Sequence, residues 1–253
     1  MSEAIPDELR GQLVAAGQSH VLRWWPQLTT AGRARLLSQL SSIDLTSLRS
    51  LWGLSQGSVD QTSEESPRER AQRAVPPRDF VALPMAAEQN AVRRRAAALG
   101  DELLRAGRVG VLLVAGGQGT RLQFPHPKGM FPIGPVTGRT LYQWLAEQVL
   151  ARSRRAGRPI PFYIMTSDAT HDETVEFFRA HQWFGLPPGD VAFFRQGTMP
   201  VLNLADGRLL MASRGEIVES PDGHGGVIAA LQRDKPLDDM GSRGLANQFS
   251  MQA

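Results

Sequence analysis

The sequence contains no cysteine among its 253 residues. A disulfide-stabilised scaffold and a thiolate metal site are therefore excluded, and any metal must bind oxygen or histidine ligands. The longest apolar run has only the length of a strand, well short of the about 20 residues needed to cross a bilayer. The first ten residues, MSEAIPDELR, lack the basic and apolar regions of a secretory signal. We therefore expect a soluble protein that is compatible with a reducing cytoplasm.

Positive charge is in slight excess, but its distribution does not favour nucleic-acid binding. The formal net charge is +3 and the pI is about 9.9. The arginines are dispersed, and the tight cluster at residues 93–95 falls on a predicted helix, where a solvent-exposed face is the simpler interpretation. Aromatic residues, which stack on bases, do not alternate with basic ones. We expect neither a nucleic-acid partner nor a membrane partner.

A glycine-rich segment directly follows an apolar run and predicts a phosphate-binding loop. Residues 109–115 are continuously apolar, which is typical of a parallel strand that helices cover on both faces. Gly116, Gly117 and Gly119 follow at once. Without Cβ atoms these residues adopt positive φ freely and let backbone N–H groups approach an anion. The alternative is an ordinary β-turn after a core strand, which the residues that come next disfavour.

The spacing after the glycines excludes two common phosphate-binding motifs. A Walker loop is absent because no Gly-Lys pair is followed by Ser or Thr. A dinucleotide-binding fingerprint is absent because the sixth position from Gly117 is Leu122, which is too bulky for close helix packing. What remains is a loop that continues with Thr120 and Arg121 and reaches Pro127-Lys128-Gly129 six residues later.

Lysine is scarce, which draws attention to Lys128. Of the 28 lysine and arginine residues, only Lys128 and Lys235 are lysine. The arginine guanidinium is planar, whereas the lysine ammonium is a compact charge on a flexible side chain. Arginine therefore does not readily replace lysine where one movable cation must contact a phosphate oxygen. We interpret Lys128 as such a cation, with a chance occurrence as the alternative.

The first third of the chain predicts a helical segment and a linker. Apolar residues recur at helical intervals over residues 7–52, which predicts two or three helices. Residues 53–75 are polar and rich in Gly, Ser and mixed charge, so they predict a linker. We therefore divide the chain into an N-terminal helical appendage with its linker, residues 1–75, and a nucleotide-binding part, residues 76–253.

The second part alternates helices and strands. Helices are predicted over residues 86–106, from a capping box at Thr140 to Gln143, from a second capping box at Thr170 to Glu173, and over residues 227–231. Strands are predicted at 109–115, 161–166 and 191–195, and Asp206-Gly207 predicts a hairpin. This alternation indicates a doubly wound, mainly parallel α/β sheet that binds ligands at the carboxyl ends of its strands.

Two further polar clusters fall at such strand ends. Gln196 follows the strand at 191–195, and its amide offers the donor and acceptor that suit a pyrimidine edge, although a glutamine bonded to local backbone is the commoner outcome. Gly223 and His224 lie in the glycine-rich segment PDGHGG before an apolar helix, which suits an anion or a polyhydroxy ligand. A plain loop is the alternative here.

Taken together, these motifs resemble the UDP-sugar pyrophosphorylase family. AGGQGTRL, PKGMFPIGP, YIMTS, FFRQG and GHGG occur in the family's order, and GQSHVLRWWPQL is similar to its helical N-terminal segment. The resemblance runs from about residue 8 to the end. It implies a Rossmann-like nucleotidyltransferase fold and a uridylyltransferase that acts on UTP and either glucose 1-phosphate or N-acetylglucosamine 1-phosphate.

The resemblance also implies roles for individual residues. Ala115, Gly116 and Gly117 would hold the uracil and ribose of UTP, and the phosphates would lie against Gly119, Thr120 and Arg121. Lys128 would neutralise the α-phosphate and the departing pyrophosphate. Gln196 and Gly223 would read the uracil edge, and His224 would face the ribose and the sugar phosphate. Mg²⁺ would bridge the phosphates, so catalysis would consist mainly of positioning and charge neutralisation.

The sequence departs from the family pattern at two places. Gln123 stands where the family usually has glycine after GTRL, and it is expected to stiffen or crowd the loop. The final segment, RGLANQFSMQA, resembles the start of the family's RG-x-x-x-x-F-x-x-Q-V-D-N-P segment, whose aspartate supplies a metal ligand. We therefore expect the given residues to recognise a uridine nucleotide but to turn over poorly alone.

Three functional interpretations stay open on sequence grounds. The first is a uridylyltransferase. The second is a non-catalytic protein that binds uridine nucleotides with Mg²⁺. The third is an interaction module that uses the helices of residues 7–52 for docking and does not depend on Lys128.

Overall fold

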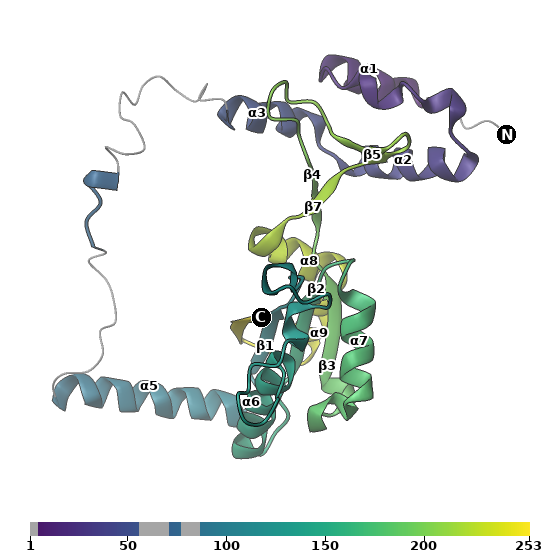
Figure 1. The fold of residues 1–253 in the computed structure, drawn as a ribbon. Coiled ribbons are helices and arrows are strands. Elements are labelled where there is room, and N and C mark those ends of the chain that lie inside the picture. Colours follow the sequence, from purple (N-terminus) through teal and green to yellow (C-terminus); the bar gives the residue numbers. More distant parts are fainter. Residues whose placement is uncertain (1–4, 56–70, 77–86) are drawn as a thin grey trace. The chain divides into compact units, whose positions relative to one another are not determined.

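The computed structural model describes residues 5–55, 71–76 and 87–253. The chain divides into two compact units (Figure 1). One contains the N-terminal helices together with residues 198–220. The other contains residues 83–197 and 221–253 and carries the predicted nucleotide site. No helix among the described residues is long and apolar enough to span a membrane.

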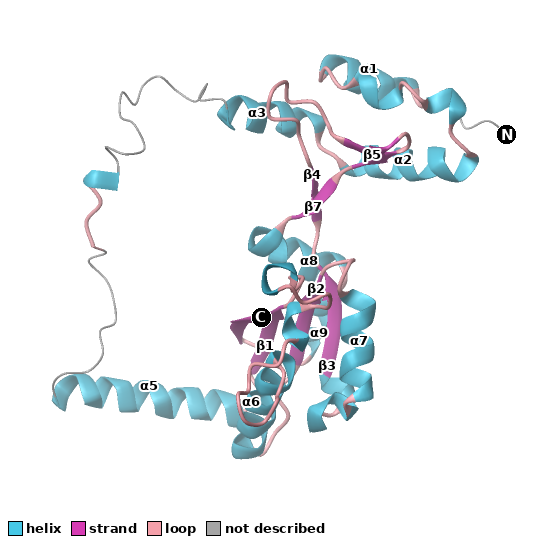
Figure 2. Ribbon diagram, in the orientation of Figure 1, coloured by secondary structure: helices cyan, strands magenta, loops and turns pink. Residues whose placement is uncertain are grey.

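The second unit is built on a parallel four-stranded sheet in the order β3-β2-β1-β8 (Figure 2). Its strands are β1 (Val109–Val114), β2 (Phe162–Thr166), β3 (Val191–Arg195) and β8 (Asn247–Gln252). Every pairing in this sheet is parallel, with Val111 opposite Phe162 and Phe162 opposite Val191. The three sequence-predicted strands are therefore confirmed, and the doubly wound α/β class is correct.

Helices cover both faces of the sheet because successive strand residues point to opposite sides. On one face, Leu113 and Ile164 pack with residues of α6 (Leu141–Ala156) and α7 (His171–Ala180). On the other face, Leu112 and Met165 pack with residues of α8 (Val227–Arg233) and α9 (Pro236–Ser242). The long helix α5 (Ala87–Arg105) precedes β1, in agreement with the predicted helix, whose first residue lies outside the described residues.

The two predicted capping boxes differ in outcome. Thr140 caps α6, since its hydroxyl accepts a hydrogen bond from the Gln143 amide at 3.2 Å, but the Gln143 side chain donates to Glu147 instead of returning to the cap. Thr170 precedes α7 without capping it. Its hydroxyl instead accepts from the Ser167 amide at 3.1 Å. The second capping box is therefore wrong, because a closer partner takes the hydroxyl.

The N-terminal helices are confirmed. They are α1 (Asp7–Ala15), α2 (Thr30–Ser42) and α3 (Leu45–Ser55), with short 3₁₀ turns at Ser19–Leu22 and Trp25–Gln27. Leu13, Leu36 and Leu40 are almost fully buried in their shared core. Residues 53–55 of the predicted linker are the last turn of α3, and much of its remainder lies outside the described residues.

Residues 198–220 pack with these helices. The predicted N-terminal part, residues 1–75, did not include this segment. The segment contains β4 (Thr198–Pro200), β5 (Met211–Ser213), β6 (Glu216–Ile217) and the start of β7 (Glu219–Pro221). Gln18 donates to the Gly207 carbonyl at 3.0 Å and accepts from the Leu209 amide at 2.9 Å. Gln39 binds both polar backbone groups of Ile217 in the same way. Two glutamine side chains thus form hydrogen bonds with backbone groups of this segment that a neighbouring strand would otherwise bind.

The hairpin at Asp206-Gly207 is present only in part. Gly207 has a φ of 68°, and a single antiparallel bridge joins Leu202 to Leu209. The longer ladder in this segment pairs β5 with β6 instead. No pattern in the sequence predicted β8 or α9. Strand β8 lies at the sheet edge and is mostly exposed, so its residues carry no clear apolar alternation.

Candidate functional site

The carboxyl ends of β1, β2 and β3 bring the first two polar clusters together. The Ala115 amide donates to the Met165 carbonyl at 2.7 Å, and the Gln196 amide donates to the Thr166 carbonyl at 2.7 Å. Both segments therefore leave the sheet beside the end of β2. The sequence predicted this common edge from the parallel order of the strands alone.

Gly116 and Gln196 are in direct contact. A Cβ atom on Gly116 would lie 2.6 Å from Oε1 of Gln196, so a side chain at residue 116 would displace the amide from this position. Gln196 is 7% exposed, yet its side chain forms no hydrogen bond with any described residue. Its amide presents a donor and an acceptor side by side, so this group is suited to a ligand that supplies the complementary acceptor and donor.

The glycine loop leaves several backbone amides available. Within the described part of the chain, the N–H groups of Gly116, Gly117 and Gln118 donate to no other group. The loop is closed further along, where the Gly119 amide donates to the His126 carbonyl and the Lys128 amide donates to the Gly117 carbonyl, both at 3.0 Å. A closed loop with unused amides near its start is the geometry expected of an anion cradle.

The middle of the loop projects outward. Thr120 and Arg121 begin a short 3₁₀ turn, Thr120–Leu122, and both are exposed with no side-chain partner among the described residues. Gln123 ends the turn in the left-handed region, with a φ of 53° and a ψ of 34°. This conformation is the reason glycine suits the position, and Gln123 adopts it at an energetic cost.

Lys128 is exposed beside the end of β8. Its Nζ donates to the main-chain carbonyl of Ala253 at 3.1 Å. The following residue, Gly129, is buried against the ring of Tyr142, and any Cβ atom at this position would overlap the ring. Burial raises the pKa of Tyr142 to about 12, so its hydroxyl is protonated at neutral pH and donates to the Ala115 carbonyl at 3.4 Å. One buried side chain thus supports both ends of the loop.

The third cluster joins the second through Asp222. The Asp222 amide donates to the Gly197 carbonyl at 3.1 Å. Its carboxylate lies against Gly197 and Gly226, where Cβ atoms would overlap it. Gly223 has a φ of 64°, and His224 is exposed in the 3₁₀ turn Gly223–Gly226. Asp222, the residue before Gly223, is therefore bonded to the residue after Gln196. His224 is exposed to solvent.

Charged residues around Arg195 form part of the site that the sequence did not predict. The Arg195 guanidinium pairs with Asp168 at 3.1 Å and with Asp172 at 3.3 Å, and the Arg195 amide donates to Asp234 at 3.0 Å. A hydrogen bond from Arg233 lowers the pKa of Asp234, which keeps this acceptor ionised. The network fixes the backbone directly before Gln196. Its members are scattered along the chain, so no local pattern identifies it.

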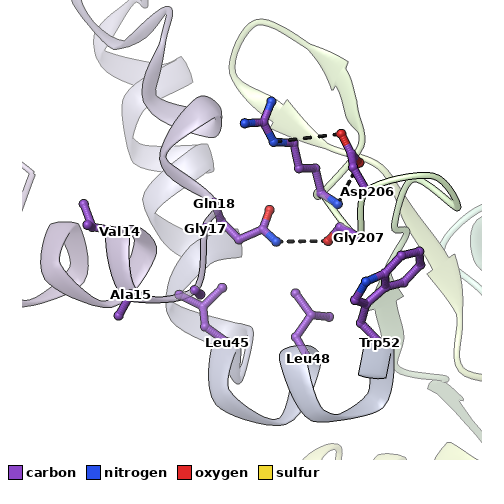
Figure 3. Close-up of a pocket in the computed structure, with 11 residues that line it drawn as sticks. Val14, Ala15, Gly17, Gln18, Leu45, Leu48, Trp52, Asp206 and Gly207 are labelled. Atoms are coloured by element: carbon purple, nitrogen blue, oxygen red, sulfur yellow. Dashed lines mark hydrogen bonds and ion pairs between the residues drawn. The ribbon is translucent and has the colours of Figure 1, made fainter. Parts of the chain in front are cut away.

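The N-terminal unit contains a cavity of about 300 Å³ between α1, α3 and the turn at Asp206-Gly207 (Figure 3). Leu45, Leu48 and Trp52 line it on one side, and Gln18 reaches across to Gly207. Both polar ends of the Gln18 amide are already bonded, and Asp206 pairs with Arg208 at 3.9 Å. None of the predicted site residues belongs to it, and its polar groups are largely paired.

A doubly wound parallel sheet with a glycine loop and a free glutamine amide at its carboxyl edge is typical of a nucleotide-binding α/β protein. The comparison with protein families makes this assignment specific. The model of the UTP–glucose-1-phosphate uridylyltransferase family matches residues 60–250, so the chain belongs to this family. The resemblance predicted from the sequence motifs is therefore confirmed.

The most similar relatives include UDP-N-acetylhexosamine pyrophosphorylase-like protein 1 of Homo sapiens, which is 35% identical over 96% of this chain and 48% of its own length. The UDP-N-acetylglucosamine pyrophosphorylase of Saccharomyces cerevisiae is 33% identical over 93% of this chain and 50% of its own length. The crystal structure of the Trypanosoma brucei uridine diphosphate N-acetylglucosamine pyrophosphorylase superposes with a TM-score of 0.70 at 25% identity and covers 98% of this chain and 52% of that chain. The chain thus spans about half the length of these relatives.

Proposed function

We propose that the chain binds UTP as part of a uridylyltransferase that transfers UMP to a sugar 1-phosphate and releases pyrophosphate. The observation that carries this proposal is the contact between Gly116 and the unpartnered amide of Gln196, next to the unused amides of the glycine loop. The Gln196 amide can hydrogen-bond a base, and the backbone amides of the glycine loop can bind phosphates. Because both lie at the same edge of the sheet, they suit a pyrimidine nucleotide.

The proposed binding mode follows the order of these groups along the sheet edge. The uracil would lie between Ala115 or Gly116 and Gln196, with Gly223 on its other side. The phosphates would extend along the unused amides of residues 116–118 towards Gly119, Thr120 and Arg121. Lys128 would approach the α-phosphate, since its amide is already bonded to Gly117. His224, which is exposed, would face the ribose and the sugar phosphate.

The proposed reaction requires no protein nucleophile. An oxygen of the sugar 1-phosphate attacks the α-phosphorus of UTP in line, the bond from that phosphorus to the bridging oxygen of the β-phosphate breaks, and pyrophosphate leaves with the electron pair. Loop amides hold the phosphates in line, and the ammonium of Lys128 offsets charge on the α-phosphate and the leaving group. Positioning and charge neutralisation account for catalysis of this kind.

Mg²⁺ remains part of the proposal, but the described residues do not fit a dedicated protein site for it. No group of three or more acidic or histidine side chains that could hold a metal occurs in the described part of the chain. Magnesium commonly binds through substrate phosphates with one or two carboxylates, so we propose that it accompanies UTP.

We propose N-acetylglucosamine 1-phosphate as the first sugar phosphate to test, with glucose 1-phosphate as its comparison. The curated relatives with the broadest coverage are named for N-acetylhexosamine or N-acetylglucosamine, whereas the family description names glucose. We also propose a cytoplasmic location, which the cysteine-free composition supports. Fractionation of the source cells tests the location.

Two measurements test the proposed function. Calorimetry of the protein with UTP and Mg²⁺ should detect binding, with CTP and ATP clearly weaker. A pyrophosphate-release assay with UTP and each sugar phosphate should detect little turnover by residues 1–253 alone. The assay can be repeated after adding the part of a full-length relative that this chain does not cover. If the protein binds UTP but no sugar phosphate is converted under either condition, the non-catalytic nucleotide-binding alternative is favoured. Absence of UTP binding would contradict the proposal.

A further inference from the structure

A histidine within the glycine loop is attached to a helix outside it. Nδ1 of His126 lies 2.5 Å from Oε1 of Glu173, and both side chains are about half exposed. Glu173 belongs to the first turn of α7, next to Thr174, which is fully buried. Because α7 is fixed on the sheet through such buried residues, Glu173 offers the loop a stable point of attachment.

His126 also sits between the two backbone hydrogen bonds that close the loop. Its carbonyl accepts from the Gly119 amide at 3.0 Å, and two residues later the Lys128 amide donates to the Gly117 carbonyl at 3.0 Å. The ring of Phe124 packs edge-on against the His126 ring, with centroids 5.0 Å apart. A displacement of His126 would therefore move Gly119 and Lys128 together.

We propose that His126 and Glu173 form a positioning pair that holds the loop amides and the Lys128 ammonium in the arrangement that grips a triphosphate. The inference rests on the proposed function. His126 does not touch the nucleotide in this account. It acts through the backbone of Gly119 and Lys128, so its removal should weaken phosphate binding and leave recognition of the base unchanged.

The closing experiment compares UTP with uridine, which lacks phosphates, by NMR titration of the whole chain. His126→Ala and Glu173→Ala should each weaken UTP binding by about 3- to 20-fold and leave uridine binding within about 2-fold. The double variant should be no weaker than the worse single variant, because the two side chains act as one unit. His126→Asn, whose amide can replace Nδ1, should recover part of the affinity.

The chain offers a matched control on the same helix. Glu176 pairs with Arg179 at 2.8 Å on the exposed surface of α7, and Glu176→Ala should leave UTP binding unchanged. Equal losses of UTP and uridine affinity in His126→Ala would indicate general damage to the site and would overturn the proposal. Unchanged UTP affinity in both single variants would overturn it as well.

Hydrogen exchange separates this inference from the proposed function. In the protein without ligand, His126→Ala should speed exchange of the Gly119 and Lys128 amides and leave the α7 amides unchanged. Should the unaltered protein bind no UTP, the proposed function fails, and the exchange rates still decide whether the pair holds the loop. Identical exchange in His126→Ala and the unaltered protein would contradict the positioning role.

Discussion

The two glycine-rich segments of the site are built in opposite ways. In the loop at residues 116–129, Gly119 and Gly129 have no room for a side chain, and backbone hydrogen bonds close the loop on itself. In the turn at residues 223–226, Gly223 and Gly225 have open space around them, and His224 is exposed. The loop is closed by its own backbone hydrogen bonds, whereas among the glycines of the turn Gly226 alone is packed, against the Asp222 carboxylate.

This difference indicates how the two ends of a nucleotide would be bound. The loop is pre-organised, so a triphosphate would meet amides that are already in place, and little conformational entropy would be lost on binding. In the turn at residues 223–226, Gly223 and Gly225 have no neighbour within 4 Å of an added Cβ atom, so the ribose and sugar side would depend more on the ligand itself. We therefore expect changes in the loop to have larger effects than matched changes in the turn.

The largest effect is expected from Gly129→Ala, compared with Gly225→Ala. A methyl group at position 129 overlaps the buried ring of Tyr142, whereas position 225 has no neighbour within 4 Å. Overpacking should cost about 2–3 kcal/mol or more of unfolding free energy at 129, against about 0.5 kcal/mol or less at 225. Urea denaturation measures both. Equal midpoints for the two variants would show that the loop is not packed as described.

The next largest effect is expected from Lys128→Met, with Lys235→Met as its control, because these are the two lysines of the chain. Loss of a charged contact to phosphate should weaken UTP binding by about 1.5–3 kcal/mol, or roughly 10- to 150-fold. Lys235 is exposed and precedes α9, so its replacement should leave UTP affinity nearly unchanged. Equal affinities in calorimetry for Lys128→Met and the unaltered protein would support the docking-module interpretation instead.

A smaller effect is expected from Gln196→Ala. The amide should contribute about 1 kcal/mol to nucleotide binding, and the loss should be the same for UTP and uridine because the group contacts only the base. His224→Ala should weaken UTP binding less than this, since the imidazole is exposed. Competition titrations with both ligands measure these ratios. A loss confined to UTP would place Gln196 on the phosphates.

The smallest effect concerns stability at Gln123. Replacement by glycine removes a side chain from a left-handed conformation with a φ of 53° and should stabilise the protein by about 0.5–1 kcal/mol. Gln118→Gly is the matched control, because Gln118 lies in the same loop without a positive φ, and it should destabilise by a similar amount. Thermal unfolding of the two variants should therefore shift in opposite directions, and shifts in the same direction would contradict the strain at Gln123.

Local patterns in the sequence were enough to predict the sheet and the loop. The apolar run before Gly116 fixed β1, and the strand order placed Gln196 at the same edge. Contacts between distant residues were not predictable. His126 and Glu173 are separated by 47 positions, and neither lies in a pattern that points to the other. Strand β8 was missed because an exposed edge strand needs no regular apolar alternation, as the 60% exposure of Phe249 illustrates.

The second capping box failed for a related physical reason. Its two residues are present at the right spacing, but each has another partner. The Thr170 hydroxyl accepts from the Ser167 amide three residues earlier, and Glu173 pairs with His126, 47 positions away in the chain. Spacing predicts local bonds well when no tertiary partner competes, as at Thr140. Residues 198–220 show the same limit, since the segment is bonded to the buried amide of Gln18 and the partly buried amide of Gln39, which are far away in the chain.

An NMR titration of isotope-labelled protein with UTP and Mg²⁺ shows whether the glycine loop binds the triphosphate. If the glycine loop binds the triphosphate, the amide resonances of Gly116, Gly117, Gln118 and Gly119 should shift and saturate together with UTP. Uridine should shift Gly116, which lies beside the base, and leave Gln118 and Gly119 unshifted. Shifts confined to the cavity between α1 and α3, or no saturable shift in the loop, would contradict the account.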